Sequence, residues 1–339
     1  MITCLCTPKE KYDGERIKNT YVYKSLAKKV TVDVIDLSKH KIFNTFRIFW
    51  NALFKRRRYD FIFISKDPHG ANIIQKILFA GGIKPSKIVY FEIGPFLYNR
   101  INDGSIKKET FINDRLIVVE TNSMKNELLS LGFKNVDIFP NFKEIFDVKF
   151  KEQKYPKQIL KLAFFSRIEE PKGIYDLIDV LKQINNSKVK YTLDVYGRVQ
   201  NKDEEKRFYE SISGLTFIEY KGKIDLNCVE SYEVLREYDA HVFPTKYPEG
   251  FPGTIIDFFI AGVPTISSSF ARANDILTNH DSIIYVQGNN EDLYKKLFEL
   301  YDNQNVLDSL RINSYQRRNQ FSVESFDGYL DKLLGELYE

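Results

Sequence analysis

The chain has 339 residues, of which 43% are hydrophobic and 28% charged, and its net charge is +4. This composition is typical of a folded globular protein and excludes an intrinsically disordered chain. The length exceeds one ordinary hydrophobic core and predicts two domains of roughly 150 residues each. Because there is no apolar run of about 18 residues and the N-terminus turns polar at Lys9, we expect no spanning helix and no signal peptide, hence a cytoplasmic protein.

Charge is distributed unevenly along the chain. Residues 1–150 contain 26 Lys and Arg against 16 Asp and Glu, a net charge of +10, whereas the remainder carries −6. The first half is therefore expected to meet something anionic, such as a lipid headgroup, a phosphate-bearing acceptor or nucleic acid. The three cysteines, Cys4, Cys6 and Cys228, cannot all pair and are expected to be reduced thiols.

Apolar runs rich in Val, Ile and Phe recur along the chain, each followed by a stretch with helical spacing. The first half holds six of them: ITCLC, VTVDVIDL, FIFIS, KIVYFEI, RLIVVE and VDIFP. The second half holds six more: LKLAFFS, YTLDVYG, FIEYKG, AHVFP, VPTISSS and IIYV. Strands that alternate with helices at this spacing predict an α/β fold of two Rossmann-like lobes, each with a parallel sheet, facing a central cleft.

A polar, lysine-rich stretch at 149–158, with Pro156 inside it, predicts the linker between the lobes. We therefore expect one domain over residues 1–152 and a second over 153–317. After about Asn290 the pattern is helical, and a last helix at about 318–339 is expected to pack back on the first domain.

Ligands of open α/β sheets bind beyond the carboxyl ends of the strands, so the loops after the first-lobe strands contain candidate residues. Gly14 and Arg16, in KYDGER, follow the first strand and are candidates for the cleft. His69, in SKDPHGAN, follows the strand FIFIS and would bind the acceptor or the hydroxyls of a donor. Alternatively, His69 is an ordinary loop histidine satisfied by the backbone.

The segment KIFNTFRIFWNALFKRRR, residues 41–58, places Phe43, Phe46, Trp50 and Leu53 at helical spacing and ends in four consecutive bases. Amphipathic helices with aromatic and basic residues lie on anionic membranes. A buried crossover helix of any α/β lobe shows the same stripe, with the rings facing the core. Both interpretations remain open from the sequence.

In the second half, the strand LAFFS ends at Ser166 and a helix is predicted to start near Lys172 or Gly173. Arg167 and Lys172 lie in the loop between them. A guanidinium fork and an ammonium together suit a diphosphate whose charge grows as a glycosidic bond breaks. The alternative is that both are solvated surface bases.

The segment from Ala240 predicts a buried strand, a turn from Glu249 to Gly253, and a short helix closed by Gly262. Glycines allow a ligand to approach the backbone, and amides at a helix start favour anionic oxygens. The carboxylate of Glu249 can accept hydrogen bonds from two neighbouring sugar hydroxyls. Asp257, eight residues on or about two helical turns, would share that side. Alternatively, the glycines form only a tight turn and Asp257 favours the helix dipole.

The pattern Glu249-Gly250-Phe251-Pro252, an acid at Asp257 and Ala-Gly-Val-Pro at 261–264 resembles the signature of the retaining glycosyltransferases of family 4, which have the GT-B fold. Arg167 and Lys172-Gly173 are similar to that family's diphosphate-binding pair. Smaller matches follow in the family's order, at Gly197, Gly222 and Thr245. The resemblance covers about residues 136–290, and it departs at Asp257, where the family usually has Glu.

The resemblance implies a hexosyltransferase that acts on a nucleotide-sugar co-substrate, most simply a UDP-sugar, with no other cofactor. Glu249 would contact the hexose, and the segment 250–253 would hold sugar and phosphate through its amides. Asp257 would bind the ribose, and Arg167 with Lys172 would stabilise the departing diphosphate. No Asp-x-Asp follows a strand in the manner of metal-dependent transferases, so no metal is expected.

The resemblance also implies that the first domain binds the acceptor, a saccharide or lipid-linked saccharide in surface polysaccharide synthesis. The enzyme would then sit peripherally at the inner face of the membrane. Two rivals remain, a nucleotide-sugar epimerase of GT-B fold and a non-catalytic GT-B partner subunit. A nicotinamide dehydrogenase is disfavoured because no Gly-x-Gly-x-x-Gly follows the first strand, and nucleic acid because no basic and aromatic platform is present.

Overall fold

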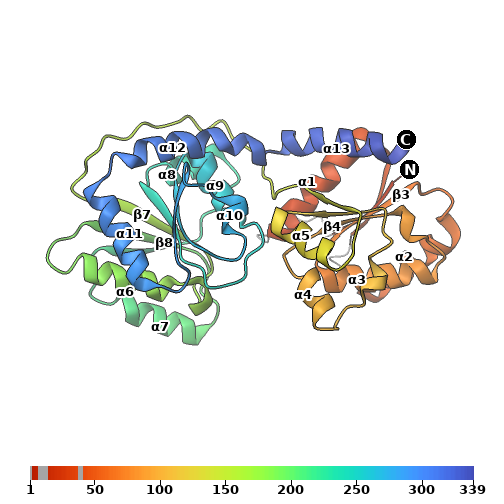
Figure 1. Cartoon of the computed structure of the whole chain (residues 1–339), viewed down its shortest axis with the longest axis horizontal. Coiled ribbons are helices and arrows are strands. Elements are labelled where there is room, and N and C mark those ends of the chain that lie inside the picture. Colours follow the sequence, from red (N-terminus) through yellow and green to blue (C-terminus); the bar gives the residue numbers. More distant parts are fainter. Residues whose placement is uncertain (1, 7–13, 37–40) are drawn as a thin grey trace. The chain divides into compact units, whose positions relative to one another are not determined.

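A computed structural model of the chain describes residues 2–6, 14–36 and 41–339, with side chains for residues 18–35 and 43–339. The chain divides into two compact units: unit 1 comprises Met1–Lys143 with Phe321–Glu339, and unit 2 comprises Glu144–Gln320. Each unit contains a six-stranded parallel sheet flanked by helices (Figure 1). The prediction of two Rossmann-like α/β lobes is confirmed, and all twelve predicted strands occur in the described part of the chain.

The sheet of unit 1 has the strand order β2-β1-β3-β4-β5-β6. The strands and helices of this unit are β1 (Ile2–Cys6), α1 (Gly14–Lys29), β2 (Val32–Asp36), α2 (Lys41–Lys55), β3 (Phe61–Lys66), α3 (Pro68–Ala80), β4 (Ile88–Glu92), α4 (Leu97–Asn102), β5 (Leu116–Val119), α5 (Asn122–Ser130), β6 (Val136–Ile138) and α13 (Val323–Tyr338).

The sheet of unit 2 has the order β12-β11-β10-β7-β8-β9. Its elements are β7 (Leu160–Phe165), the 3-10 turn η3 (Glu170–Lys172), α6 (Ile174–Ile184), β8 (Tyr191–Tyr196), α7 (Lys202–Ile212), β9 (Ile218–Gly222), α8 (Val229–Leu235), β10 (Ala240–Phe243), α9 (Gly253–Ala261), β11 (Thr265–Ser268), α10 (Ala273–Ile276), β12 (Ser282–Tyr285), α11 (Asn290–Asp302) and α12 (Val306–Arg317).

Both faces of the sheet in unit 1 are buried, which explains why its strands are apolar without interruption. Successive side chains of a strand point to opposite faces. Ile62 and Ile64 of β3 accordingly pack in one core cluster with residues of α2, α3 and α5, whereas Phe63 packs in another with residues of α1 and α13. Helices therefore cover each face of the sheet.

The last helix, α13, packs on unit 1 beside α1 (Figure 1). Lys28 and Lys29 at the end of α1 form ion pairs with Asp327 and Asp331, at 3.2 and 2.6 Å. Phe326 is fully buried, and its ring stacks on that of Phe142 with centroids 4.1 Å apart. The helix thus contributes to the core of a unit whose other strands and helices all lie before Lys143.

The lysine-rich stretch at 149–158, predicted as a linker, lies within unit 2, and the chain passes from unit 1 to unit 2 after Lys143. Lys157 Nζ lies 2.5 Å from an oxygen of Asp239, and Tyr155 donates to the same carboxylate at 2.9 Å. The polar composition predicted a solvent-exposed linker. Instead, Tyr155 and Lys157 bind the carboxylate of Asp239, directly before β10.

The helices are of ordinary length, and α1 and α13 contain 16 residues each. Among the helices that the structure describes, none combines the length and the apolarity needed to cross a lipid bilayer.

Candidate functional site

The strand order of unit 2 places its predicted site residues at one point of the sheet. From β7 the chain adds β8 and β9 on one side, and β10 then pairs with the other side of β7. The loops after β7 and β10 therefore diverge at a topological switch point, where open α/β sheets bind ligands. Arg167 and Lys172 follow β7, and Thr245 and Glu249 follow β10.

Lys172 and Glu249, 77 residues apart in sequence, form an ion pair at this point. Lys172 Nζ lies 2.5 Å from Glu249 Oε1, and the two side chains are only 8% and 13% exposed. The hydroxyl of Thr245 donates to the same oxygen at 2.9 Å, and the ring of Tyr247 lies 4.7 Å from the ammonium. Glu249 Oε2 receives no hydrogen bond from the described residues, so it remains able to accept one.

Direct backbone contact holds the two loops together. Gly173 has φ +74°, and a Cβ at this position would lie 1.9 Å from the carbonyl oxygen of Pro244. The amide of Lys246 donates to the carbonyl of Pro171 at 2.8 Å. Lys246 Nζ also pairs with Glu170 at 2.8 Å. Only glycine combines this φ with so close an approach, so the loop that carries Lys172 is seated directly on the loop after β10.

Arg167 differs from Lys172 in its surroundings. Its guanidinium pairs with Glu169 at 3.2 Å, but its side chain is 51% exposed. The loop that carries Arg167 packs closely on Gly197, because a Cβ added at Gly197 would lie 1.7 Å from the carbonyl oxygen of Ser166. The structure therefore presents one buried cation, Lys172, and one exposed cation, Arg167, from the same connection between β7 and α6.

The turn from Glu249 leads into α9, which begins at Gly253 after Pro252 with φ −65° and without a side-chain cap. Phe251 is buried and anchors the turn. Gly262, with φ +67°, ends the helix as the sequence predicted. Segment 250–253 thus lies at the amino end of a helix, where backbone amides favour an anion.

Asp257 is only 1% exposed, and its carboxylate accepts a hydrogen bond from the hydroxyl of Tyr232 in α8 at 2.9 Å. The sequence analysis placed Glu249 and Asp257 two helical turns apart, but Glu249 precedes α9, which begins at Gly253. The two acids are therefore not on one continuous helix. The proline and the glycines keep the backbone non-helical before Gly253.

Four further residues position this site and were not identified from the sequence. Tyr247 faces Lys172, and Arg272 donates to the carbonyl of Glu249 at 3.5 Å. Ser268 and Gln287 both donate to the carbonyl of Thr245, at 2.6 and 3.1 Å. Ser268 is the last residue of β11, and Arg272 and Gln287 follow β11 and β12 within a few residues. Applying the carboxyl-end rule to these two strands would have found Ser268, Arg272 and Gln287, whereas Tyr247 lies in the loop after β10.

The first-lobe candidates lie at the corresponding switch point of unit 1, between β1 and β3. Gly14 is the first residue of α1, and the side chain of Arg16 lies outside the described residues. His69 is exposed in the first turn of α3, which Asp67 caps by accepting from the amide of Gly70 at 3.0 Å.

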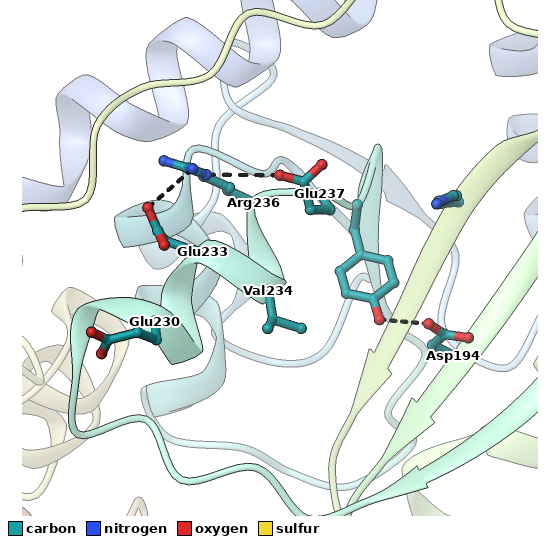
Figure 2. A pocket seen from close by; sticks show the side chains of 8 residues that line it. Asp194, Glu230, Glu233, Val234, Arg236 and Glu237 are labelled. Carbon is teal, nitrogen blue, oxygen red and sulfur yellow. Dashed lines mark hydrogen bonds and ion pairs between the residues drawn. The ribbon is translucent and has the colours of Figure 1, made fainter.

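A cavity of about 470 Å³ lies elsewhere in unit 2, beside α8 (Figure 2). Arg236 lines it and pairs with Glu233 at 3.0 Å, while Tyr238 donates to Asp194 at 2.6 Å. Its lining includes Lys161, near the amino end of β7. The cavity is therefore away from the carboxyl edge that carries the predicted residues, and it includes none of them.

Within the residues that the structure describes, no group of three or more His, Cys, Asp or Glu side chains is arranged to hold a metal ion. Cys228 is a free thiol beside the hydroxyl of Ser231, 3.3 Å away. The side chains of Cys4 and Cys6 lie outside the described residues.

Comparison with known proteins gives a family and a fold. Residues 145–317 match the model of the family "Glycosyl transferases group 1". A search of curated protein sequences found no match. Three similar solved structures are HepE from Anabaena in complex with UDP (14% identity, 99% of each chain, TM-score 0.75), sucrose-phosphate synthase from Thermosynechococcus elongatus (13%, 99% of this chain and 98% of that one, 0.76) and a glycosyltransferase from Rickettsia africae (15%, 100% and 98%, 0.74).

At such identities the structural similarity shows the fold alone, which is that of the GT-B glycosyltransferases. The family model itself spans just over half of the chain and includes every predicted site residue of unit 2. The chain therefore belongs to the glycosyl transferases of group 1 and is a glycosyltransferase of GT-B fold.

Proposed function

We propose that the protein transfers a hexose, with retention of configuration and without a metal, from a nucleotide-diphosphate sugar to a saccharide or lipid-linked saccharide. The observation that carries this proposal is the buried Lys172–Glu249 pair at the switch point between β7 and β10. In this pair, the carboxylate of Glu249 can accept hydrogen bonds from sugar hydroxyls, and the ammonium of Lys172 can bind the diphosphate of the same donor.

Glu249 positions the hexose. Its Oε1 is held by Lys172 and Thr245, which orients the carboxylate and leaves Oε2 to accept from a sugar hydroxyl. The ammonium of Lys172 has three donors, so it can bond a phosphate oxygen while it stays paired with Glu249. Without a ligand the ion pair has no net charge, so the fold does not have to bury an isolated charge at this position.

The diphosphate meets three favourable groups. Lys172 is held in place, Arg167 is exposed enough to move onto an arriving anion, and segment 250–253 offers amides at the start of α9. As the glycosidic bond breaks, negative charge grows on the departing diphosphate and the two cations stabilise it. The acceptor hydroxyl then attacks the anomeric carbon from the same face and passes its proton to the departing diphosphate, so that the products are the glycoside and the nucleoside diphosphate. A ribose contact by Asp257, which we also propose, competes with its bond to Tyr232.

The similar structures support the choice of donor. HepE was solved with UDP, with UDP and glucose, and with UDP-glucose. We therefore propose a UDP-sugar as the first donor to test. The acceptor is assigned to unit 1, where Gly14, Arg16 and His69 remain the candidates and where the charge favours an anionic or lipid-linked molecule.

The test combines donor binding with turnover. A thermal-shift panel of UDP, GDP, ADP and dTDP sugars identifies the donor, since a ligand that binds only the folded state raises its melting temperature. Arg167→Ala is expected to fold normally and to lose about 10²-fold or more in kcat, because a charge-stabilising group is removed. Lys182→Ala is the matched control, since it also breaks an exposed 3.2 Å ion pair but lies on α6 away from the switch point. Normal turnover of the Arg167 variant would refute this role.

Two further measurements separate the rival functions. Glu249→Gln is expected to keep the fold and to lose transfer, because an amide cannot accept at both of its terminal atoms. Incubating the labelled donor without an acceptor distinguishes transfer from epimerisation, since an epimerase needs no acceptor. If the donor binds but no acceptor from a saccharide and lipid-linked panel is glycosylated, the protein is a partner subunit and not the transferase.

A further inference from the structure

Helix α2 exposes an unusual set of large apolar side chains. Six of its residues have between 36% and 65% of their surface exposed: Phe43, Phe46, Phe49, Trp50, Leu53 and Phe54. At about 100° per residue, all six fall within an arc of about 140° on one side of the helix. They form what we call the aromatic face of α2.

The opposite side of the same helix packs against the core of unit 1, to which the helix belongs. Ile48 and Ala52 are buried there, and so are the amides Asn44 and Asn51. A crossover helix that merely completed a core would bury its rings and expose its amides. Here the order is reversed, so the interpretation of the Phe43–Leu53 stripe as a core stripe is wrong.

Three of the exposed rings are in contact along the helix. Trp50 lies 5.8 Å from Phe46 and 4.3 Å from Phe54, measured between ring centroids. The aromatic face therefore has a continuous centre from Phe46 to Phe54 and is not a set of isolated apolar residues. Continuous apolar surface of this kind marks an interaction site.

Positive charge borders the aromatic face. Arg47 is about half exposed within the helix, and Lys55 is followed by the exposed residues Arg56, Arg57 and Arg58. No acidic residue occurs between Lys41 and Tyr59. Arg47 lies 3.9 Å from Asp33 of β2, and the exposed Asp60 follows the run of bases. The surface is thus complementary to an anionic partner.

We propose that the aromatic face of α2 docks on a lipid bilayer that contains anionic headgroups. Tryptophan and phenylalanine are favoured at the depth where headgroups meet acyl chains, and the adjacent bases lie at the level of lipid phosphates. Each base near an anionic surface strengthens attachment, so rings and charges act together. This inference concerns attachment of unit 1 and holds whether or not the proposed transfer reaction is correct.

Trp50 is the only tryptophan in the chain, so its fluorescence reports on this surface directly. With the full-length protein, vesicles of phosphatidylcholine and phosphatidylglycerol are expected to shift the Trp50 emission to shorter wavelength. Doxyl-labelled lipid in the same vesicles is expected to quench it. Pure phosphatidylcholine vesicles are expected to bind at least about tenfold more weakly, because the basic residues then have no anionic partner.

Two double variants test the two parts of the surface while keeping Trp50. Phe46→Ala with Phe54→Ala removes rings, and its control is Phe298→Ala, an exposed ring of α11 in unit 2. Arg57→Gln with Arg58→Gln removes two charges, and its control is Lys188→Gln with Lys202→Gln, two exposed bases of unit 2. Each α2 variant is expected to lower vesicle binding by about tenfold or more, and each control to leave it unchanged.

Three results would overturn the proposal. One is an absence of emission shift with anionic vesicles. Another is equal loss of binding in the unit 2 controls. The third is a Trp50 emission that is already at short wavelength without lipid and changes with protein concentration, which would show that a second copy of the chain covers α2.

Discussion

Asp114 is a buried carboxyl group that the site does not use. It lies in the turn before β5, almost without solvent exposure, and accepts a hydrogen bond from the side-chain amide of Gln75 at 2.7 Å. Burial raises the pKa of Asp114 to about 9, against the opposing effect of that hydrogen bond. The folded protein therefore holds a proton at neutral pH that the unfolded chain releases near pH 4.

Stability should accordingly fall as pH rises. The stabilisation from this proton is complete below about pH 4 and is lost as pH approaches about 9, with a slope of about 1.4 kcal/mol per pH unit from this one group. Asp114→Asn is expected to flatten the dependence of the free energy of unfolding on pH, measured by urea denaturation across that range. The control is Asp302→Asn, an exposed acid in α11. An unchanged slope in the Asp114 variant would contradict the assignment.

Gly173 is where a single methyl group should separate the two loops of the site. Gly173→Ala would place a Cβ 1.9 Å from the carbonyl oxygen of Pro244, at φ +74°. Gly214→Ala is the matched control, because its φ is +75° and nothing lies within 4 Å of its Cβ. The control should lose about 1–2 kcal/mol of stability and Gly173→Ala at least about 1 kcal/mol more, by denaturant unfolding. If Gly173→Ala and Gly214→Ala lowered the free energy of unfolding equally, the close contact between Gly173 and Pro244 would not contribute to stability.

At the scale of elements, α13 completes the core of unit 1 from the far end of the chain. Phe326 contacts the rings of Phe91, Phe139 and Phe142, which come from β4 and from the segment after β6. Leu330 is fully buried in the same cluster. The helix therefore contributes to the stability of unit 1 through its apolar side, and its ion pairs to α1 are more exposed and weaker.

Phe326→Ala is expected to lower the free energy of unfolding by about 3–5 kcal/mol, because it leaves a cavity among packed rings. Phe298→Ala, which truncates a partly exposed ring of α11, should cost clearly less. Both are measured by denaturant unfolding of the full chain. A loss below about 1 kcal/mol at Phe326 would show that α13 is not an integral part of the unit 1 core.

Helix α2 illustrates how an element can be predicted while its orientation is not. The sequence predicts a helix over 41–58 with Phe43, Phe46, Trp50 and Leu53 on one side, and the structure contains that helix over Lys41–Lys55. Periodicity is the same whether rings face a core or a surface. Only the packing of Ile48 and Ala52 against unit 1 shows which side faces outward.

At the scale of the whole molecule, the two units have separate sheets and separate cores, and the two proposed ligands belong to different units. The basic first half of the sequence contains α2. The acidic remainder contains the proposed donor site, where Lys172 and Arg167 supply positive charge at the switch point. Ligand effects should therefore be local to one unit.

Hydrogen exchange of the full chain measures this separation. UDP is expected to protect amides in 166–173 and 245–253 and to leave α2 unchanged, because those two loops form the proposed diphosphate site. Anionic vesicles are expected to protect the region of α2 and to leave both loops unchanged. Protection by UDP confined to unit 1 would place the donor elsewhere and refute the assignment of the Lys172–Glu249 cluster.

The sequence by itself determined the order of strands and helices, the parallel α/β class and the residues at the ends of the strands. Those features depend on neighbours in sequence: apolar runs, glycine and proline stops, and the motif around Glu249. Tertiary structure alone decided that Lys172 meets Glu249, that Asp257 bonds to Tyr232, and that the rings of α2 face outward. Each of these depends on which strands lie side by side and on which side of a helix finds a core, and local periodicity does not specify either.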